Sequence, residues 1–223
     1  MERDKVLSKI LKAGIVPVVR TSTPESAIRS VESLEKGGIP VAEITLTVPG
    51  ALAVLERLAR EFGDRVLLGA GTVLDCDTAR AALRAGAQFL LTPALDPAII
   101  ECARLESKIV LAGALTPTEV LKAWNSGADV VRVLPCNAMG GASYIRSLRA
   151  PFPDVRLMPI GGVTLENVGD FFRAGAVGVG VSGALIDSAS LRAGSYEVFI
   201  ERAHRFVEAI RRIRHEMAMP SLV

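Results

Sequence analysis

Eight short apolar runs recur along the chain, and this repeat limits the possible folds more than any other feature. A near-continuous apolar run of this length is typical of a parallel strand that is covered on both faces. The runs begin about 20 to 27 residues apart, and they are Ile15–Arg20, Val41–Thr47, Val66–Thr72, Phe89–Leu95, Ile109–Leu115, Val130–Cys136, Leu157–Val163 and Val177–Leu185. The repeat therefore predicts eight buried parallel strands.

Amphipathic stretches lie between these runs, and several begin with capping chemistry. Thr23-Pro24 and Thr116-Pro117 each place a hydroxyl at the N-cap and proline at the first helical position, and Glu119 completes a capping box with Thr116. The expected helices are Glu2–Lys12, Pro24–Lys36, Asp75–Arg84, Asp96–Ser107, Pro117–Asn125, Leu165–Arg173 and Tyr196–Met217. Glycine is expected in the left-handed conformation after the helices, at Gly37, Gly63, Gly86, Gly127 and Gly175.

Alternation of strands and helices predicts an α/β fold with a parallel sheet. Eight such units within 223 residues favour a closed (β/α)8 barrel, the TIM barrel, over an open doubly wound sheet. The stretch Glu2–Lys12 adds an extra helix before the first strand. Because no linker or low-complexity segment interrupts the repeat, we expect residues 1–223 to form a single domain.

Charge and cysteine content exclude several classes of protein. With 26 basic and 24 acidic residues the net charge is only +2, which gives no basic footprint for nucleic acid. The basic run Arg211, Arg212 and Arg214 is expected to be a solvated helix face. No apolar run approaches the roughly 20 residues of a membrane span. Three scattered cysteines without a Cys-x-x-Cys pair favour a reducing compartment, so we expect a cytoplasmic protein.

No metal or cofactor is expected from the motifs. The two histidines, His204 and His215, both fall in the last helical pattern, away from strand ends. Neither a P-loop nor a dinucleotide-binding glycine motif is present, because Gly69-Ala70-Gly71 lacks the third glycine that would open a helix.

In a barrel of this type the functional residues lie at the carboxyl ends of the strands. Gly161-Gly162 follows the seventh run, and Ser182 lies between Gly180 and Gly183 at the eighth. Glycine lets backbone amides approach an anion closely, so this pair of loops predicts a small-anion site, with phosphate favoured. The alternative is that these glycines only permit tight turns.

Two charged residues lie inside otherwise apolar runs. Side chains alternate along a strand, so Glu43, Thr45 and Thr47 share one face and the apolar face packs on the helices. Glu43 then points into the barrel, where burial would raise its pKa unless a cation compensates, and it could transfer a proton. Arg132 needs a carboxylate partner, which is either Glu43 in a structural ion pair or a bound keto acid.

These motifs resemble the 2-keto-3-deoxy-6-phosphogluconate (KDPG) / 4-hydroxy-2-oxoglutarate (KHG) aldolase family over nearly the whole chain. The matching segments are Ala42-Glu43-Ile44-Thr45-Leu46-Thr47, Gly69-Ala70-Gly71-Thr72-Val73, Ala87-Gln88-Phe89-Leu90-Leu91-Thr92-Pro93, Leu115-Thr116-Pro117-Thr118-Glu119, Pro151-Phe152-Pro153 and Gly161-Gly162-Val163. The resemblance implies a homotrimeric, metal-free lyase that cleaves a 2-keto-4-hydroxy acid to pyruvate and an aldehyde, through a Schiff base on a lysine of the sixth strand.

The resemblance also implies roles for individual residues. Glu43 matches the general acid/base of the family. The other pocket positions carried over are Arg20, Thr47, Thr72 and Pro93 for the substrate and Gly161, Gly162 and Ser182 for its phosphate.

The chain departs from the family pattern at the nucleophile, because Arg132 occupies the position of the Schiff-base lysine in Arg132-Val133-Leu134-Pro135. A guanidinium stays protonated and cannot attack a carbonyl. Three hypotheses follow: an aldolase impaired by this residue, non-covalent Glu43-assisted keto-acid chemistry, or a catalytically silent trimeric scaffold that binds keto acid or phosphate.

Overall fold

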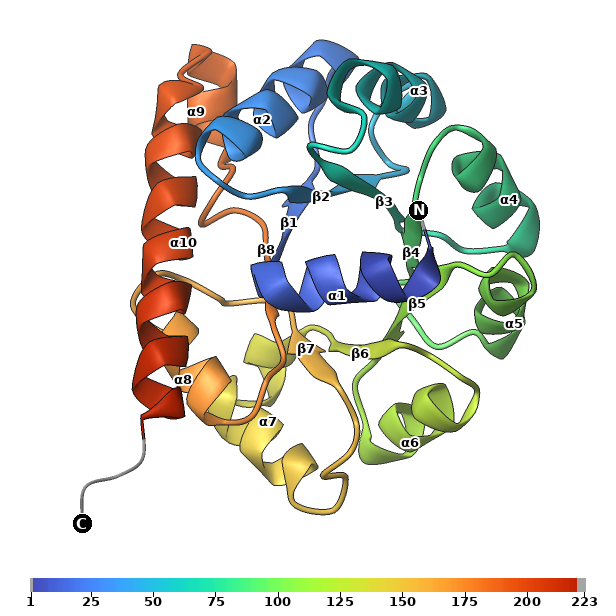
Figure 1. Cartoon of the computed structure of the whole chain (residues 1–223), viewed down its shortest axis with the longest axis vertical. Coiled ribbons are helices and arrows are strands. Elements are labelled where there is room, and N and C mark those ends of the chain that lie inside the picture. The colour runs from blue at the N-terminus through green and yellow to red at the C-terminus, as the bar shows by residue number, and fades with distance from the viewer. Residues whose placement is uncertain (1, 220–223) are drawn as a thin grey trace.

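The computed structural model describes residues 2–219, and the predicted (β/α)8 barrel is confirmed. Eight parallel strands run in the order β7-β6-β5-β4-β3-β2-β1-β8, and a bridge between Ile160 and Gly180 brings the two ends of the sheet together. The strands are β1 (Ile15–Val19), β2 (Val41–Thr45), β3 (Leu67–Gly71), β4 (Phe89–Leu91), β5 (Ile109–Ala114), β6 (Val130–Val133), β7 (Leu157–Pro159) and β8 (Val179–Val181). Figure 1 shows the ring of helices that surrounds them.

The helices that were expected from caps lie within three residues of their predicted bounds. They are α1 (Arg3–Ala13), α2 (Pro24–Lys36), α4 (Cys76–Arg84), α5 (Pro97–Leu105), α6 (Pro117–Asn125), α8 (Val168–Arg173) and α10 (Glu197–Ala218). The hydroxyl of Thr23 accepts from the amide of Ser26, and Thr116 and Glu119 form the predicted capping box. Asp75 and Asp96 are the N-caps of α4 and α5 rather than their first residues.

Helices α3 (Ala51–Phe62) and α7 (Ala142–Arg149), together with the short η1 (Cys136–Met139) and α9 (Ser188–Ala193), were not among the expected helices. Helices α3 and α7 begin after Gly50 and Gly141, which provide no side-chain cap, so the capping signal is absent there. The strands end earlier than their apolar runs. At β4 and β6, for example, the last residues of the run bend into loops that carry Pro93 and Pro135.

The prediction for Gly37 is wrong. Gly37 has a φ of −79°, and the left-handed residue is Gly38, with a φ of +88°. Gly37 is instead a packing position, because an added Cβ would lie 2.4 Å from Cβ of Ala203 in α10. The glycine therefore lets α10 pack on α2, and Figure 1 shows α10 running along one side of the barrel beside α2 and α8.

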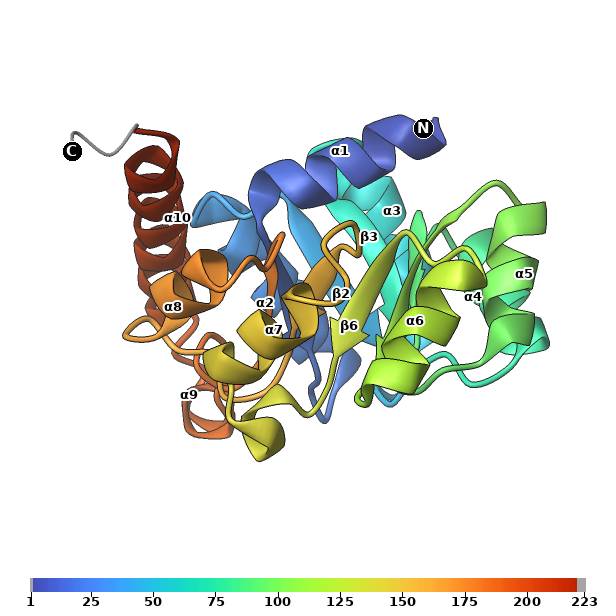
Figure 2. The same cartoon turned by 90° about the horizontal axis from the view of Figure 1, so that it is seen from below.

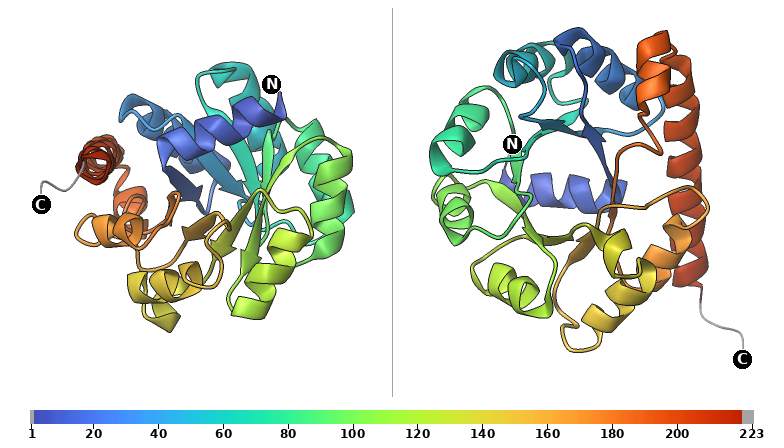
Figure 3. Two further views of the ribbon diagram at one scale, coloured as in Figure 1. Left: turned by 60° about the horizontal axis from the view of Figure 1, so that its bottom comes forward. Right: turned by 180° about the vertical axis from the view of Figure 1, so that it is seen from behind.

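Helix α1 closes the amino-terminal end of the barrel, as Figure 2 shows. Val6 and Ile10 pack into the barrel interior, where they meet side chains such as Phe89 and Met158. The helix is fixed at both ends: Arg3 forms a salt bridge with Asp129, and Arg214 of α10 donates to the carbonyls of Leu11 and Lys12. The right-hand view of Figure 3 looks onto the opposite, carboxyl-terminal end of the strands.

Candidate active site

Glu43 and Arg132 meet inside the barrel, as the alternation of β2 predicted. Ala42 and Ile44 pack in the outer core against the helices, while Glu43 is 2% exposed and Arg132 3% exposed. Arg132 Nη2 lies 3.0 Å from Glu43 Oε2, and Nη1 lies 3.5 Å from Oε1. Of the two partners that the sequence allowed for Arg132, the structure therefore shows Glu43.

Burial and charge act in opposite directions on Glu43. Removal from water raises the pKa of this carboxyl above its ordinary value, and the guanidinium of Arg132 lowers it, with burial the larger effect. The charge of Arg20 at the end of β1 lowers the pKa of Glu43 further. A buried carboxyl with a raised pKa holds its proton more tightly than an exposed one, which suits it to general acid/base chemistry.

Gly71, not singled out as a site residue from the sequence, makes the position of Glu43 possible. A Cβ at Gly71 would lie 1.8 Å from Oε1 of Glu43, so only glycine leaves room for the carboxylate. The next residue, Thr72, has a φ of +61°, which is strained for a β-branched side chain. The signal in the sequence was a glycine at the end of β3, the strand that pairs with β2.

The other positions that the resemblance assigned to the substrate lie around the carboxyl-terminal end of the barrel. Arg20 and Thr47 are exposed just after β1 and β2, while Thr72 and Pro93 are half-buried just after β3 and β4. Thr47 shares a hydrogen bond of 2.9 Å with Thr45. Within residues 2–219 no hydrogen bond joins these four side chains to Glu43 or Arg132, although the charge of Arg20 acts on Glu43.

The predicted anion loops also come together. The bridge between Ile160 and Gly180 places Gly161 and Gly162 beside the turn that contains Ser182. Gly161 and Gly162 have φ angles of +99° and +72°, and a Cβ on either would lie within 2.7 Å of the Asn137 side chain. These glycines thus have a structural role as well, because they permit the backbone turn and the close approach of Asn137.

Cys136 packs inside the protein. It is fully buried, and its thiol donates to the carbonyl of Gly141 over 3.4 Å. Burial raises the pKa of this thiol to about 11, so it is a poor nucleophile at neutral pH. Within residues 2–219 no group of three or more His, Cys, Asp and Glu side chains could hold a metal ion, and no helix is both long enough and apolar enough to cross a membrane.

Comparisons with known proteins agree on one family. A sequence profile described as KDPG and KHG aldolase matches residues 6–201. The 2-dehydro-3-deoxy-6-phosphogalactonate aldolase of Escherichia coli K12 is 33% identical over 202 residues, which covers 90% of this chain and 96% of that protein. The 2-dehydro-3-deoxy-phosphogluconate aldolase of Pseudomonas aeruginosa is 34% identical over 161 residues and 72% of each chain.

A solved structure described as native KDPGal superposes with a TM-score of 0.83 at 30% identity. The alignment covers 90% of this chain and 96% of that one. The similarity therefore extends to the arrangement of the whole barrel.

Proposed function

Because the chain belongs to the KDPG and KHG aldolase family, we propose that its barrel mouth binds a phosphorylated 2-keto-4-hydroxy acid and that Arg132 impairs its cleavage to pyruvate and an aldehyde. The observation that carries this proposal is the buried pair of Arg132 and Glu43 at the centre of the barrel. The acid/base position of the family is present, and the nucleophile position holds a guanidinium. In a class I mechanism a free amine attacks the keto carbon and, with loss of water, forms an iminium; the iminium then accepts the electron pair of the breaking carbon–carbon bond and becomes an enamine.

None of the six lysines of the chain lies where it could supply that amine. Lys5, Lys9 and Lys12 are on α1, at the closed end of the barrel. The others are Lys36 at the end of α2, Lys108 just before β5, and Lys122 on the outer helix α6. A single substitution at position 132 should therefore decide whether the covalent step occurs.

The test is borohydride trapping with pyruvate, read by intact mass, on the chain as it is and on Arg132→Lys. We expect a pyruvyl adduct on Arg132→Lys alone, together with aldolase activity on KDPG or KHG. The matched control is Arg104→Lys, the same exchange on an exposed arginine of α5, which should give no adduct. An adduct on the unchanged chain would refute the assignment of the nucleophile position, and no adduct on Arg132→Lys would favour the silent scaffold.

A second candidate is non-covalent keto-acid chemistry at the same pair. It is supported by the raised pKa of Glu43, which suits proton transfer, and by the fixed positive charge of Arg132 beside it, which could hold a keto-acid carboxylate. This candidate expects exchange of the methyl protons of pyruvate with deuterium by the unchanged chain. Glu43→Gln should abolish that exchange.

Recognition of the substrate phosphate is assigned to the loops after β7 and β8. The support is the meeting of Gly161, Gly162 and Ser182 at one edge of the mouth, where loops of this fold commonly bind phosphate. Ser182→Glu adds a negative charge at that edge. We expect it to weaken binding of the phosphorylated acid in calorimetry while binding of pyruvate stays unchanged.

We further propose a homotrimer, which the family resemblance implies, and a cytoplasmic location and a single domain over residues 1–223, which the sequence predicts. Four leucine side chains are 39 to 67% exposed on α3 to α6 and the connections between these helices: Leu52, Leu74, Leu105 and Leu121. Contacts between the subunits of a trimer would cover such exposed apolar side chains. The three cysteines are unpaired thiols, which suits a reducing compartment. Native mass spectrometry should give three copies, and calorimetry should give one unfolding transition.

A further inference from the structure

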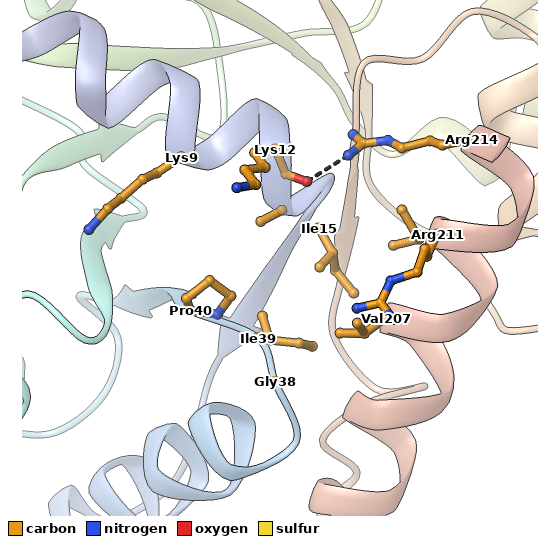
Figure 4. A pocket seen from close by; sticks show the side chains of 11 residues that line it. Lys9, Lys12, Ile15, Gly38, Ile39, Pro40, Val207, Arg211 and Arg214 are labelled. Carbon is orange, nitrogen blue, oxygen red and sulfur yellow. Dashed lines mark hydrogen bonds between the residues drawn. The ribbon is translucent and has the colours of Figure 1, made fainter. Parts of the chain in front are cut away.

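A hollow of about 490 Å³ opens at the closed end of the barrel, between α1, α10 and the connection from α2 to β2. Figure 4 shows its lining, with Lys12 of α1 and Arg211 of α10 on opposite sides of Ile15. Residues of the candidate active site do not contribute to it, because they lie at the carboxyl ends of the strands. A hollow of this volume is within the range of sites that hold small organic molecules.

The charged residues around the hollow are all basic. Lys9, Lys12, Arg211 and Arg214 line it, and acidic residues do not. In residues 2–219 none of these four basic side chains has a carboxylate within 4.0 Å, in contrast to exposed arginines such as Arg57, Arg65 and Arg104. Like charges brought together without a counter-ion repel one another, so an anion placed among them would be stabilised.

The four basic side chains are not equally available. Arg214 is occupied, because it donates to the carbonyls of Leu11, Lys12 and Val177 and so fixes α1 to α10. Lys9 donates to the carbonyl of Asp64. The side chains of Lys12 and Arg211 are exposed and form no hydrogen bond with another described residue. These two are therefore the groups that an incoming anion would meet.

The floor and walls of the hollow are apolar. Ile15, Ile39 and Ile210 are buried beneath it, and Pro40 and Val207 form its sides. Gly38, in the left-handed conformation, contributes only backbone to the lining. Apolar surface of this kind favours a ligand with a hydrocarbon body.

We propose that this hollow binds an organic anion that combines one carboxylate with an apolar body, at the end of the barrel opposite the candidate active site. The carboxylate lies between Lys12 and Arg211, and the hydrocarbon covers Ile39, Pro40 and Val207. The proposal is independent of the aldolase assignment, because it uses none of the same residues.

The first test is isothermal titration of the full chain with three probes. Octanoate has both the carboxylate and the apolar body, acetate has only the carboxylate, and 1-octanol has only the body. We expect octanoate to bind at one site per chain at least about tenfold more tightly than either of the others, a factor that corresponds to about 1.4 kcal/mol. Equal affinities for octanoate and 1-octanol would overturn the proposal, and so would the absence of octanoate binding.

The second test locates the site with matched charge reversals. Arg211→Glu should weaken octanoate binding by about tenfold or more, whereas Arg212→Glu, the same change on the adjacent exposed arginine outside the hollow, should change it less than about twofold. Equal losses would mean attraction by overall charge and would overturn the site. Val207→Trp fills the hollow without changing charge and should also abolish binding, and circular dichroism verifies that each variant is folded.

Discussion

Arg132 on β6 and Glu43 on β2 are four strands apart around the barrel, yet Nη2 and Oε2 of the two side chains lie 3.0 Å apart across its interior. This pair therefore connects opposite walls of the barrel. Each partner is almost fully buried, so neither charge can be satisfied by water if the other is removed.

Breaking this pair should therefore destabilise the protein. Arg132→Met leaves the Glu43 carboxylate without its partner, and we expect a loss of about 3–5 kcal/mol in the free energy of urea unfolding at neutral pH. The double variant Arg132→Met with Glu43→Met should recover most of that loss. Arg104→Met, which breaks an exposed pair with Glu101, serves as the control and should change stability little. Additive losses at positions 43 and 132 would contradict the coupling.

Gly71 should not tolerate alanine. The added Cβ would lie 1.8 Å from Oε1 of Glu43, and that carboxylate is held in place by Arg132. We expect Gly71→Ala to lower the unfolding free energy by about 1–3 kcal/mol, as overpacking in a core does. Gly183→Ala is the matched control, because nothing lies within 4 Å of the added carbon and the φ of Gly183 is not positive. If Gly71→Ala lost no more stability than Gly183→Ala, the neighbouring side chains would have moved to relieve the clash, and the prediction would be wrong.

Thr72 is strained, and glycine should relieve the strain. We expect Thr72→Gly to raise the unfolding free energy by about 0.5–1 kcal/mol, because the strain exceeds the entropy that glycine adds to the unfolded chain. Ser107→Gly, at the other non-glycine residue with positive φ, should stabilise similarly. If Thr72 contacts the substrate, only Thr72→Gly will weaken keto-acid binding in the Arg132→Lys background. If Thr72→Gly unfolded with a lower free energy than the unchanged chain, the prediction of backbone strain at Thr72 would be wrong.

Cys136 should resist alkylation. Its thiol is buried and its pKa is raised to about 11, so almost no thiolate exists at pH 8. Cys76 is partly exposed and should react with iodoacetamide first, which peptide mapping by mass spectrometry will show. The same reaction in urea, where all three thiols are accessible, provides the reference rate. Modification of Cys136 at that reference rate in the folded protein would contradict its burial.

Asp187 should stabilise the protein at neutral pH and lose this effect in acid. Its carboxylate accepts from the hydroxyl and the amide of Ser190, from Arg202 and from the amide of Ala189, and these hydrogen bonds hold the pKa of Asp187 well below its ordinary value. A lowered folded pKa means that the stabilisation is present above the unfolded pKa of about 3.9 and is lost as the pH falls through the folded value.

Asp187→Ala is the variant that measures this effect. It should cost about 1 kcal/mol at neutral pH, a typical value for loss of an N-cap. The difference from the unchanged chain should shrink as the pH falls below about 4. A difference that is constant with pH would show that the carboxylate charge contributes nothing.

The sequence by itself determined the barrel and the direction of its side chains. These predictions depend on local patterns: eight apolar runs, capped helices such as Pro24–Lys36 and Pro117–Asn125, and the alternation around Glu43. In each case the local hydrogen bonding and the burial of apolar side chains favour the same structure. Because parallel strands place their carboxyl ends together, the same patterns also assigned Arg20, Thr72 and Gly161 to one end of the molecule.

Only the tertiary structure decided which groups touch. It placed Arg132 against Glu43, and it showed that Gly71 and Gly37 are glycines because a carboxylate and another helix approach them. The uncapped helices α3 and α7 and the basic hollow between α1 and α10 also depend on it. These features come from contacts between residues far apart in the chain, whose distances no local pattern encodes.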